Sequence, residues 1–306
     1  MKVQANGIQI EVEDSASAEA SHQQRPVVLL IMGLGLQLVA WPEAFVQGLL
    51  DAGYRVVRFD NRDIGLSTAM DHLGKPKVAW SMIRFHMGLG FRPPYGLVDM
   101  AADALGVLDA LGIARVHLVG VSMGGMVAQR VAIAAPQRVL SLTSIMSSSG
   151  AKGLPGPRHD VLKLMMKRPK GSNEEAVVQH TLRLFQAVGS PAFPIPAEEA
   201  AQRIRQAFRR SYRPVGTLRQ MLAVVADGER AALLARITSP TLVLHGRADP
   251  LVPFACAEDT ARRIPGATLF GIEGMGHDLP AQAVQHLLAA LQPHLLAAQL
   301  RTATSV

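Results

Sequence analysis

Short runs of apolar residues alternate with helical patterns along most of this chain, and this alternation constrains the fold more than any other feature. The runs hold too few polar residues for half-exposed strands, so we expect strands that are covered on both faces. Segments 41–53 and 97–113 have helical patterns. Strands alternating with helices predict an α/β fold with a mostly parallel, doubly wound sheet. The six runs are Pro26–Met32, Tyr54–Phe59, Val116–Val121, Val139–Met146, Thr241–His245 and Ala267–Phe270.

Three parts of the chain depart from this alternation. The N-terminus reads KVQA, Asn6-Gly7 and IQIEVE, which predicts an antiparallel hairpin because Asn-Gly favours the positive φ angles of a tight turn. Between Ser147 and Arg236 no strand-like run occurs, and helical pieces predict an insertion. We therefore expect an α/β core from residues 1–147 and 237–306 and a helical cap insertion from residues 148–236. A smaller insertion spans about residues 71–95.

Composition places the chain among globular proteins. Of its 306 residues 49% are apolar and 18% are charged, which excludes intrinsic disorder. The longest apolar run, Val27–Leu36, is about half the ~20 residues of a membrane span. The single cysteine, Cys256, excludes an internal disulfide and a cysteine-rich metal site. The N-terminus lacks the features of a secretory signal, so we expect a cytoplasmic protein.

The formal net charge of +7 is concentrated in one segment. Residues 151–236 contain 15 Lys and Arg against 7 Asp and Glu, so the rest of the chain is nearly neutral. No nucleic-acid-binding motif accompanies this basic segment, and a basic surface alone is weak evidence for that partner. We expect no nucleic acid and no membrane span, and at most a weak surface association through the basic cap.

A G-x-S-x-G motif, Gly120-Val-Ser122-Met-Gly124, follows the expected strand Val116–Val121 and precedes a helical pattern. In that context the glycines permit a sharp turn that projects the serine hydroxyl above the sheet. The motif therefore predicts Ser122 as a nucleophile. The alternative is an ordinary strand-to-helix turn whose serine caps the following helix.

A serine nucleophile needs a base, and a histidine in a loop at the carboxyl edge of the sheet suits that role. Of ten histidines, His277 stands in Gly-Met-Gly-His-Asp-Leu-Pro after the last expected strand, where glycines let the imidazole reach back. We expect His277 to be the base; the alternative is an ordinary loop histidine. His117 and His245 belong to strands, and His286 and His294 fall on the C-terminal helix.

The base in turn needs a carboxylate that holds its tautomer and stabilises the imidazolium. Asp249 follows the strand-like TLVLH at its carboxyl end, although an Asp before Pro is also common in Asx turns. Among rival carboxylates, Glu258 and Asp259 fall on a helix and Asp278 adjoins the base. The chain order of nucleophile, acid and base is that of an α/β-hydrolase.

An acyl-transfer site also needs N–H donors for the negative charge that develops on the substrate carbonyl. One expected donor is the backbone N–H of Met123, directly after the nucleophile. We expect the other from the loop Met32-Gly33-Leu34-Gly35 and assign it to Leu34. The same loop would also suit a plain glycine turn, and Met32 stands where a histidine is often found.

Over nearly its whole length the chain resembles the serine α/β-hydrolases. It is most similar to the aclacinomycin methylesterase-like small esterases, in which a Met-Gly loop replaces His-Gly. The resemblance implies hydrolysis of a carboxylic ester through an acyl-enzyme, without metal or cofactor, by the triad and the two oxyanion donors named above. The cap and residues 80–91 depart from the family, so the substrate does not carry over. The similar segments are LLIMGLGLQLVAWP, VVRFDNRDIGLST, MAADALGVLDALGI and HLVGVSMGGMVAQ.

Two classes of function follow. The leading hypothesis is a cofactor-free esterase acting on a small ester or lactone, and lactonases, carbon–carbon bond hydrolases and perhydrolases share the same triad. Ser122 argues against epoxide hydrolases and haloalkane dehalogenases, which carry Asp at that turn. The other class is a hydrolase-fold binding protein with little turnover, which would tolerate loss of the triad. The sequence does not determine the oligomeric state.

Overall fold

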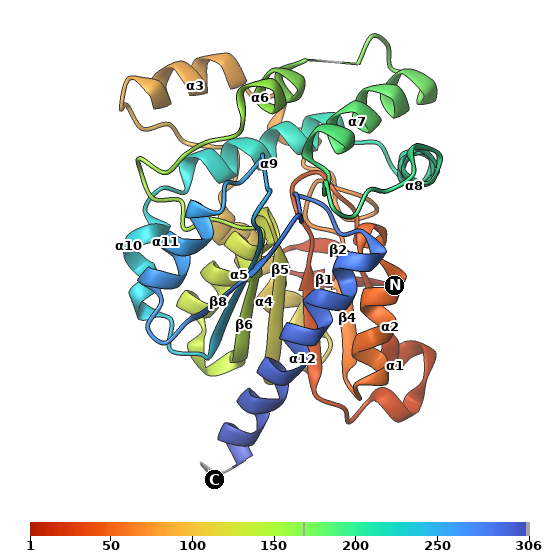
Figure 1. Cartoon of the computed structure of the whole chain (residues 1–306), viewed down its shortest axis with the longest axis vertical. Helices are drawn as coiled ribbons and strands as arrows, with labels where there is room; N and C mark the ends of the chain where they lie inside the picture. Colours follow the sequence, from red (N-terminus) through yellow and green to blue (C-terminus); the bar gives the residue numbers. More distant parts are fainter. Residues whose placement is uncertain (168, 304–306) are drawn as a thin grey trace.

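A computed structural model describes residues 1–167 and 169–303, and an eight-stranded sheet runs through its centre (Figure 1). The strands are β1 Lys2–Ala5, β2 Ile8–Asp14, β3 Val27–Ile31, β4 Arg55–Phe59, β5 Val116–Val121, β6 Val139–Ile145, β7 Thr241–Gly246 and β8 Thr268–Ile272. Their order in the sheet is β1-β2-β4-β3-β5-β6-β7-β8. β1 and β2 are antiparallel to their neighbours, and all other neighbours are parallel. The predicted mostly parallel sheet with an N-terminal hairpin is confirmed.

The hairpin turns where the Asn-Gly pair predicts it. Asn6 and Gly7 have φ angles of 46° and 78°, and Ala5 pairs with Ile8 across the turn. These positive φ angles match the right-handed twist of the flanking strands.

Helices cover both faces of the parallel part of the sheet. In β3, Leu29 and Ile31 belong to the apolar core cluster of α4 and α5, whereas Val28 and Leu30 belong to that of α2 and α12. Successive residues of a strand point to opposite faces, so two-sided cover explains the unbroken apolar run. The helices outside the large insertion are α1 Ser15–Ala18, α2 Glu43–Asp51, α3 Val78–His86, α4 Leu97–Ala110, α5 Met123–Ala134, α11 Ala255–Arg263 and α12 Ala281–Ala303.

One expectation about burial is wrong. The run at Ala267–Phe270 was expected to be covered on both faces, but β8 is the last strand of the sheet and Thr268 and Phe270 are exposed. An edge strand has fewer neighbouring elements to cover it, which the apolar run does not reveal.

Helices also fill the stretch between β6 and β7, and no strand occurs among the described residues of 148–236. Figure 1 shows α6 to α9 above the sheet, at the end opposite the C-terminus, with α3 at the same end. α10 returns to the core, where the neighbouring Leu234 is fully buried. In the described part of the chain, no helix combines the length and apolarity needed to cross a membrane. The helices of this stretch are α6 His159–Met166, α7 Glu174–Val188, α8 Ala197–Arg210, α9 Pro214–Ala226 and α10 Arg230–Leu233.

Candidate active site

The turn between β5 and α5 holds Ser122 in a backbone conformation that non-glycine residues rarely adopt, with φ 55°. Both motif glycines are required by close backbone contacts. A Cβ on Gly120 would lie 2.2 Å from the carbonyl oxygen of Gly124, and one on Gly124 would lie 2.0 Å from that of Ile31. The helix therefore starts against the strand ends, and the serine side chain projects from the top of the turn.

The three predicted catalytic side chains lie together, although they come from loops after three different strands. The Nε2 atom of His277 is 3.0 Å from Oγ of Ser122, and its Nδ1 atom is 2.6 Å from Oδ2 of Asp249. The backbone N–H of His277 donates to the carbonyl of Val188 at the end of α7, which holds the loop. A nucleophile, a base and an orienting carboxylate within hydrogen-bond reach are the arrangement that activates a serine.

Asp249 uses its two oxygens differently. Oδ1 accepts the N–H groups of Leu251 and Val252, each at 2.8 Å, so the Asx-turn alternative also holds. Oδ2 faces His277, and Nε2 of His245 lies 3.3 Å from it while donating to the carbonyl of Val252 at 2.7 Å. Burial alone would raise the pKa of Asp249, but its electrostatic interaction with His277 and the hydrogen bonds from His245 and His277 hold that pKa below its ordinary value.

The loop after β3 lies directly beside the serine. A Cβ on Gly33 would be 3.3 Å from Cβ of Ser122, and the N–H of Gly35 donates to Oε1 of Gln220 on α9 at 2.9 Å. Within residues 1–167 and 169–303, the N–H groups of Leu34 and Met123 make no hydrogen bond. These two N–H groups, which the sequence predicts as the oxyanion donors, are therefore not used in other hydrogen bonds of the described residues.

The rival carboxylates make other contacts. Asp278 accepts a short hydrogen bond from Ser190, and burial raises its pKa. Asp259 pairs with Arg262 and Arg263 on its own helix, and Glu258 is exposed. Asp249 is the carboxylate hydrogen-bonded to the base.

Sequence reasoning missed two contributors to this geometry. His245 was recognised only as a strand-end histidine, although its spacing of four residues from Asp249 could have indicated their contact. The contact of Gln220 could not be predicted from neighbouring residues, because Gln220 binds a loop 185 residues earlier in the chain.

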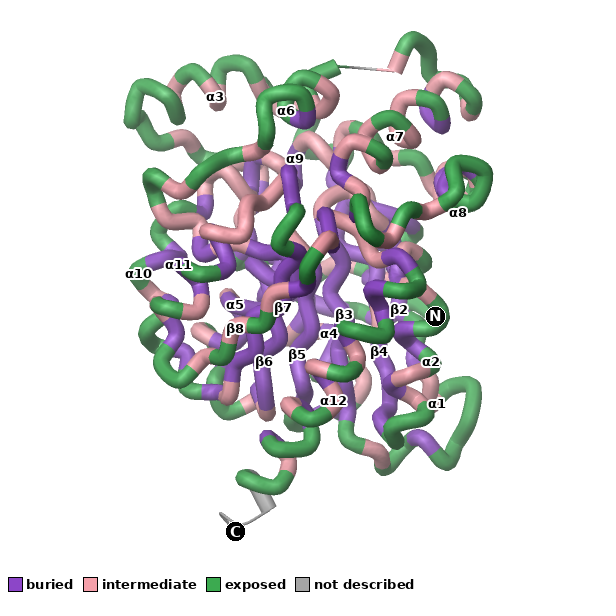
Figure 2. The backbone as a smooth tube through the Cα atoms, viewed as in Figure 1, coloured by how far each residue is buried: buried purple, intermediate pink, exposed green. Residues whose placement is uncertain are grey.

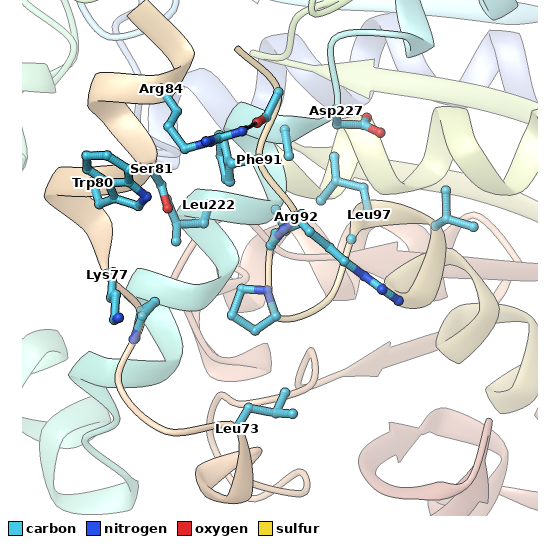
Figure 3. Close-up of a pocket in the computed structure, with 18 residues that line it drawn as sticks. Leu73, Lys77, Trp80, Ser81, Arg84, Phe91, Arg92, Leu97, Leu222 and Asp227 are labelled. Atoms are coloured by element: carbon cyan, nitrogen blue, oxygen red, sulfur yellow. Dashed lines mark hydrogen bonds between the residues drawn. The ribbon is translucent and has the colours of Figure 1, made fainter.

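The described residues contain no group of three or more His, Cys, Asp or Glu side chains arranged for a metal ion. A pocket of about 880 Å³ lies between α3, the loop before α4 and α9, and Trp80, Arg92 and Leu222 line it (Figure 3). None of the predicted catalytic residues lines this pocket.

The alpha/beta hydrolase fold family matches residues 26–283. The protein belongs to the α/β-hydrolases. This α/β-hydrolase is 32% identical to rhodomycin D methylesterase DauP of Streptomyces sp. strain C5 over 290 residues, which cover 89% of this chain and 91% of DauP. Rhodomycin D methylesterase DnrP of Streptomyces peucetius is 30% identical over 289 residues, covering 89% and 91%. The expected resemblance to α/β-hydrolases of the small methylesterase type is confirmed.

Solved structures agree with the fold. A meta-cleavage product hydrolase from Pseudomonas fluorescens superimposes with a TM-score of 0.73 at 17% identity, covering 97% of this chain and 98% of that one. At this identity the likeness shows the α/β-hydrolase fold alone.

Proposed function

We propose that this α/β-hydrolase is a cofactor-free serine esterase that cleaves a small carboxylic ester through an acyl-enzyme. The observation that carries the proposal is the continuous chain of hydrogen bonds from Ser122 through His277 to Asp249, at 3.0 and 2.6 Å. Identities of 32% and 30% to two methylesterases support an ester as the substrate class. A binding protein would not need this chain of contacts.

In the first half-reaction, Oγ of Ser122 attacks the acyl carbon while Nε2 of His277 takes the serine proton. The resulting oxyanion accepts the N–H groups of Leu34 and Met123, each worth about 3–4 kcal/mol. The bond to the alkoxy oxygen then breaks, and His277 gives its proton to the departing alcohol. Water attacks the acyl-enzyme with His277 as base, which releases the carboxylic acid and restores Ser122.

We also propose that residues 148–236 form a cap over this site, as expected from the sequence. Three contacts support this assignment: Gln220 of α9 binds the oxyanion loop, Val188 of α7 holds the backbone of His277, and Arg210 of α8 pairs with a buried core carboxylate. Because these helices lie above the strand ends, the cap shapes the space for the acyl and alcohol groups.

The direct test is hydrolysis of p-nitrophenyl acetate, without added metal, by the wild type and by Ser122→Ala. We expect the substitution to lower kcat by at least ~10⁴-fold, as the loss of a triad member does in other serine hydrolases. Ser172→Ala, at an exposed position, is the matched control and should keep wild-type activity. Activity that survives in Ser122→Ala would refute the proposal.

A second measurement separates the esterase from a binding protein. A phosphonate ester should add one covalent group to the wild type and none to Ser122→Ala, as intact mass shows. A wild type that neither turns over esters nor reacts with the phosphonate would favour the binding class. For an active enzyme, comparing kcat/KM for methyl esters, lactones and diketones decides among the activities that share this triad.

A further inference from the structure

α3 is an apolar helix that buries none of its side chains. Its sequence is VAWSMIRFH, and none of these nine residues is buried (Figure 2). Trp80 is 58% exposed and Met87, directly after the helix, is 67% exposed. A surface helix ordinarily turns its apolar stripe to the core and its polar residues to water. α3 therefore presents to solvent the kind of side chains that other helices hide.

Core packing does not account for this composition. The inner side of α3 borders the 880 Å³ pocket, with Trp80 and Arg84 on one wall and Leu222 of α9 on another (Figure 3). The guanidinium group of Arg84 donates to the carbonyl of Gly90 at 2.9 and 3.0 Å, which ties the helix to its own following loop. The inner side of α3 therefore borders the pocket, and the helix is hydrogen-bonded to the loop that follows it.

A second helix at the same end of the molecule also carries exposed apolar side chains. On α6, Leu162 is 41% exposed and Met166 is 77% exposed, and Figure 1 shows α6 and α3 at the end opposite the C-terminus. Exposed apolar side chains that gather in one region of a protein mark an interaction site more often than scattered single residues do. We call these side chains the α3–α6 face: Trp80, Ile83, Phe85, Met87, Leu89, Leu162 and Met166.

The segments that carry the α3–α6 face have more positive than negative charges. Residues 72–98 contain four Lys or Arg and no Asp or Glu, and residues 159–173, which begin with α6, contain four Lys or Arg and one acidic residue, Asp160. Asp160 pairs with Arg158 at 2.7 Å. No ion pair involving Lys77, Arg92 or Lys163 occurs among residues 1–167 and 169–303.

The arginines of α8, which make the cap sequence so basic, are different. Each has a carboxylate partner, so their charge is largely neutralised within the molecule. The sequence predicts a weak association with a membrane surface through the basic segment. Because the α8 arginines are paired, the cations around α3 and α6 suit that association better. The paired arginines are Arg203, Arg205, Arg209 and Arg210.

We propose that the α3–α6 face binds an anionic lipid bilayer. Its apolar side chains would enter the boundary between headgroups and acyl chains, and the surrounding lysines and arginines would contact lipid phosphates. Charge complementarity favours this partner over a second copy of the chain, because pairing two such faces would bring unpaired cations together. The inference is independent of the proposed esterase activity.

Tryptophan fluorescence offers a local test, because the two tryptophans have opposite environments. Trp41 is 2% exposed in the core, so a change in emission on adding vesicles reports Trp80. Vesicles with 30% phosphatidylglycerol should sediment the protein and shift its emission to the blue, and pure phosphatidylcholine should do neither. Trp80→Phe keeps the apolar surface but removes the reporter, so it should still sediment without the blue shift.

A substitution pair tests whether the apolar side chains bind. Each large apolar side chain that leaves water contributes about tenfold in affinity, so Ile83→Ser with Met87→Ser should weaken vesicle binding by about 100-fold. Leu296→Ser, an exposed leucine on α12 that is 53% exposed, is the matched control and should bind as the wild type does. Circular dichroism and thermal unfolding check that each variant is folded.

Several results would overturn the proposal. They are no binding to the anionic vesicles, equal binding to both kinds of vesicle, or unchanged binding of the double variant. Sedimentation without a blue shift that disappears in high salt would indicate adsorption by charge alone. A blue shift that grows with protein concentration in the absence of lipid would assign the face to a second copy of the chain.

Discussion

Replacing Asp249 by Asn gives the sharpest test of the proposed triad, because the structure decides which way the new amide must point. Oδ1 of Asp249 accepts the N–H groups of Leu251 and Val252, each at 2.8 Å, so the amide oxygen must take that place. The NH₂ group then faces Nδ1 of His277, which has to accept a hydrogen bond from it. The ring proton moves to Nε2, and His277 can no longer take the proton of Ser122.

The size of the effect follows from the contacts that hold the amide. Flipping it to restore the active tautomer would break both backbone hydrogen bonds and set donors against donors, at about 2 kcal/mol for each contact. The resulting ~4 kcal/mol corresponds to about 10³ in rate at 1.36 kcal/mol per tenfold change. Loss of the carboxylate charge beside the imidazolium adds about another factor of ten. We therefore expect Asp249→Asn to lower kcat by about 10³ to 10⁴.

The assay is steady-state hydrolysis of p-nitrophenyl acetate between pH 6 and 9, and KM should change by less than about threefold because the substitution does not touch the substrate. Asp278→Asn is the control, since that neighbouring carboxylate binds Ser190 instead of the base. A kcat for Asp249→Asn within tenfold of the wild type, or a larger loss in Asp278→Asn, would refute the role given to Asp249.

Three further predictions concern the turn, the oxyanion loop and a buried histidine. Gly124→Ala should destabilise the protein by about 3 kcal/mol or more in urea unfolding, because its Cβ would lie 2.0 Å from the carbonyl oxygen of Ile31. Gln220→Ala frees the N–H of Gly35 and should lower kcat about tenfold with little change in KM. Burial lowers the pKa of His117 to about 4, so the unfolded chain binds more protons below pH 6.5. His117 should therefore lower the free energy of unfolding by about 2–3 kcal/mol between pH 6.5 and 4, and His294, whose pKa burial also lowers to about 4, should add a similar fall, as urea titrations at several pH values would show.

Each of these has a matched control. Gly156→Ala should change stability by less than about 0.5 kcal/mol, since nothing lies within 4 Å of its added Cβ. Gln202→Ala, at an exposed position on α8, should keep the wild-type kcat, and an equal loss in both glutamine variants would contradict the role given to Gln220. His117→Gln should flatten the pH dependence of stability; an unchanged slope would mean that other groups cause it.

Local patterns were enough to predict the sheet, because a strand buried on both faces needs an apolar side chain at nearly every position. Val28 and Leu30 face one core cluster while Leu29 and Ile31 face the other, and both pairs are visible in the sequence as one run. The same pattern wrongly predicted that Ala267–Phe270 is covered on both faces. A position at the edge of a sheet depends on which strands pair. Strand pairing is a property of the whole chain.

Part of the candidate site could be predicted from local patterns and part could not. That Ser122, Asp249 and His277 lie close together was predictable because each follows a strand, and the carboxyl ends of parallel strands meet at one edge of the sheet. The contact between Gln220 and Gly35 was not predictable, because it joins an inserted helix to a loop far away in the sequence.

The charges of residues 151–236 also depend on tertiary contacts. Fifteen Lys and Arg in residues 151–236 predicted a basic surface, but tertiary contacts decide which cations stay unpaired. Arg210 reaches the buried carboxylate of Asp60, whereas Lys77, Arg92 and Lys163, near the exposed apolar side chains of α3 and α6, make no ion pair within residues 1–167 and 169–303.

The sequence by itself determined the order of strands and helices, the turn at Ser122 and the residues that follow the strand ends, because these depend on periodicity and on local backbone geometry. Only the tertiary structure decided how the inserted helices meet the site, which arginines find carboxylates and which apolar side chains stay in water. Those outcomes depend on distances between segments far apart in the chain, and such distances leave no periodic trace in the sequence.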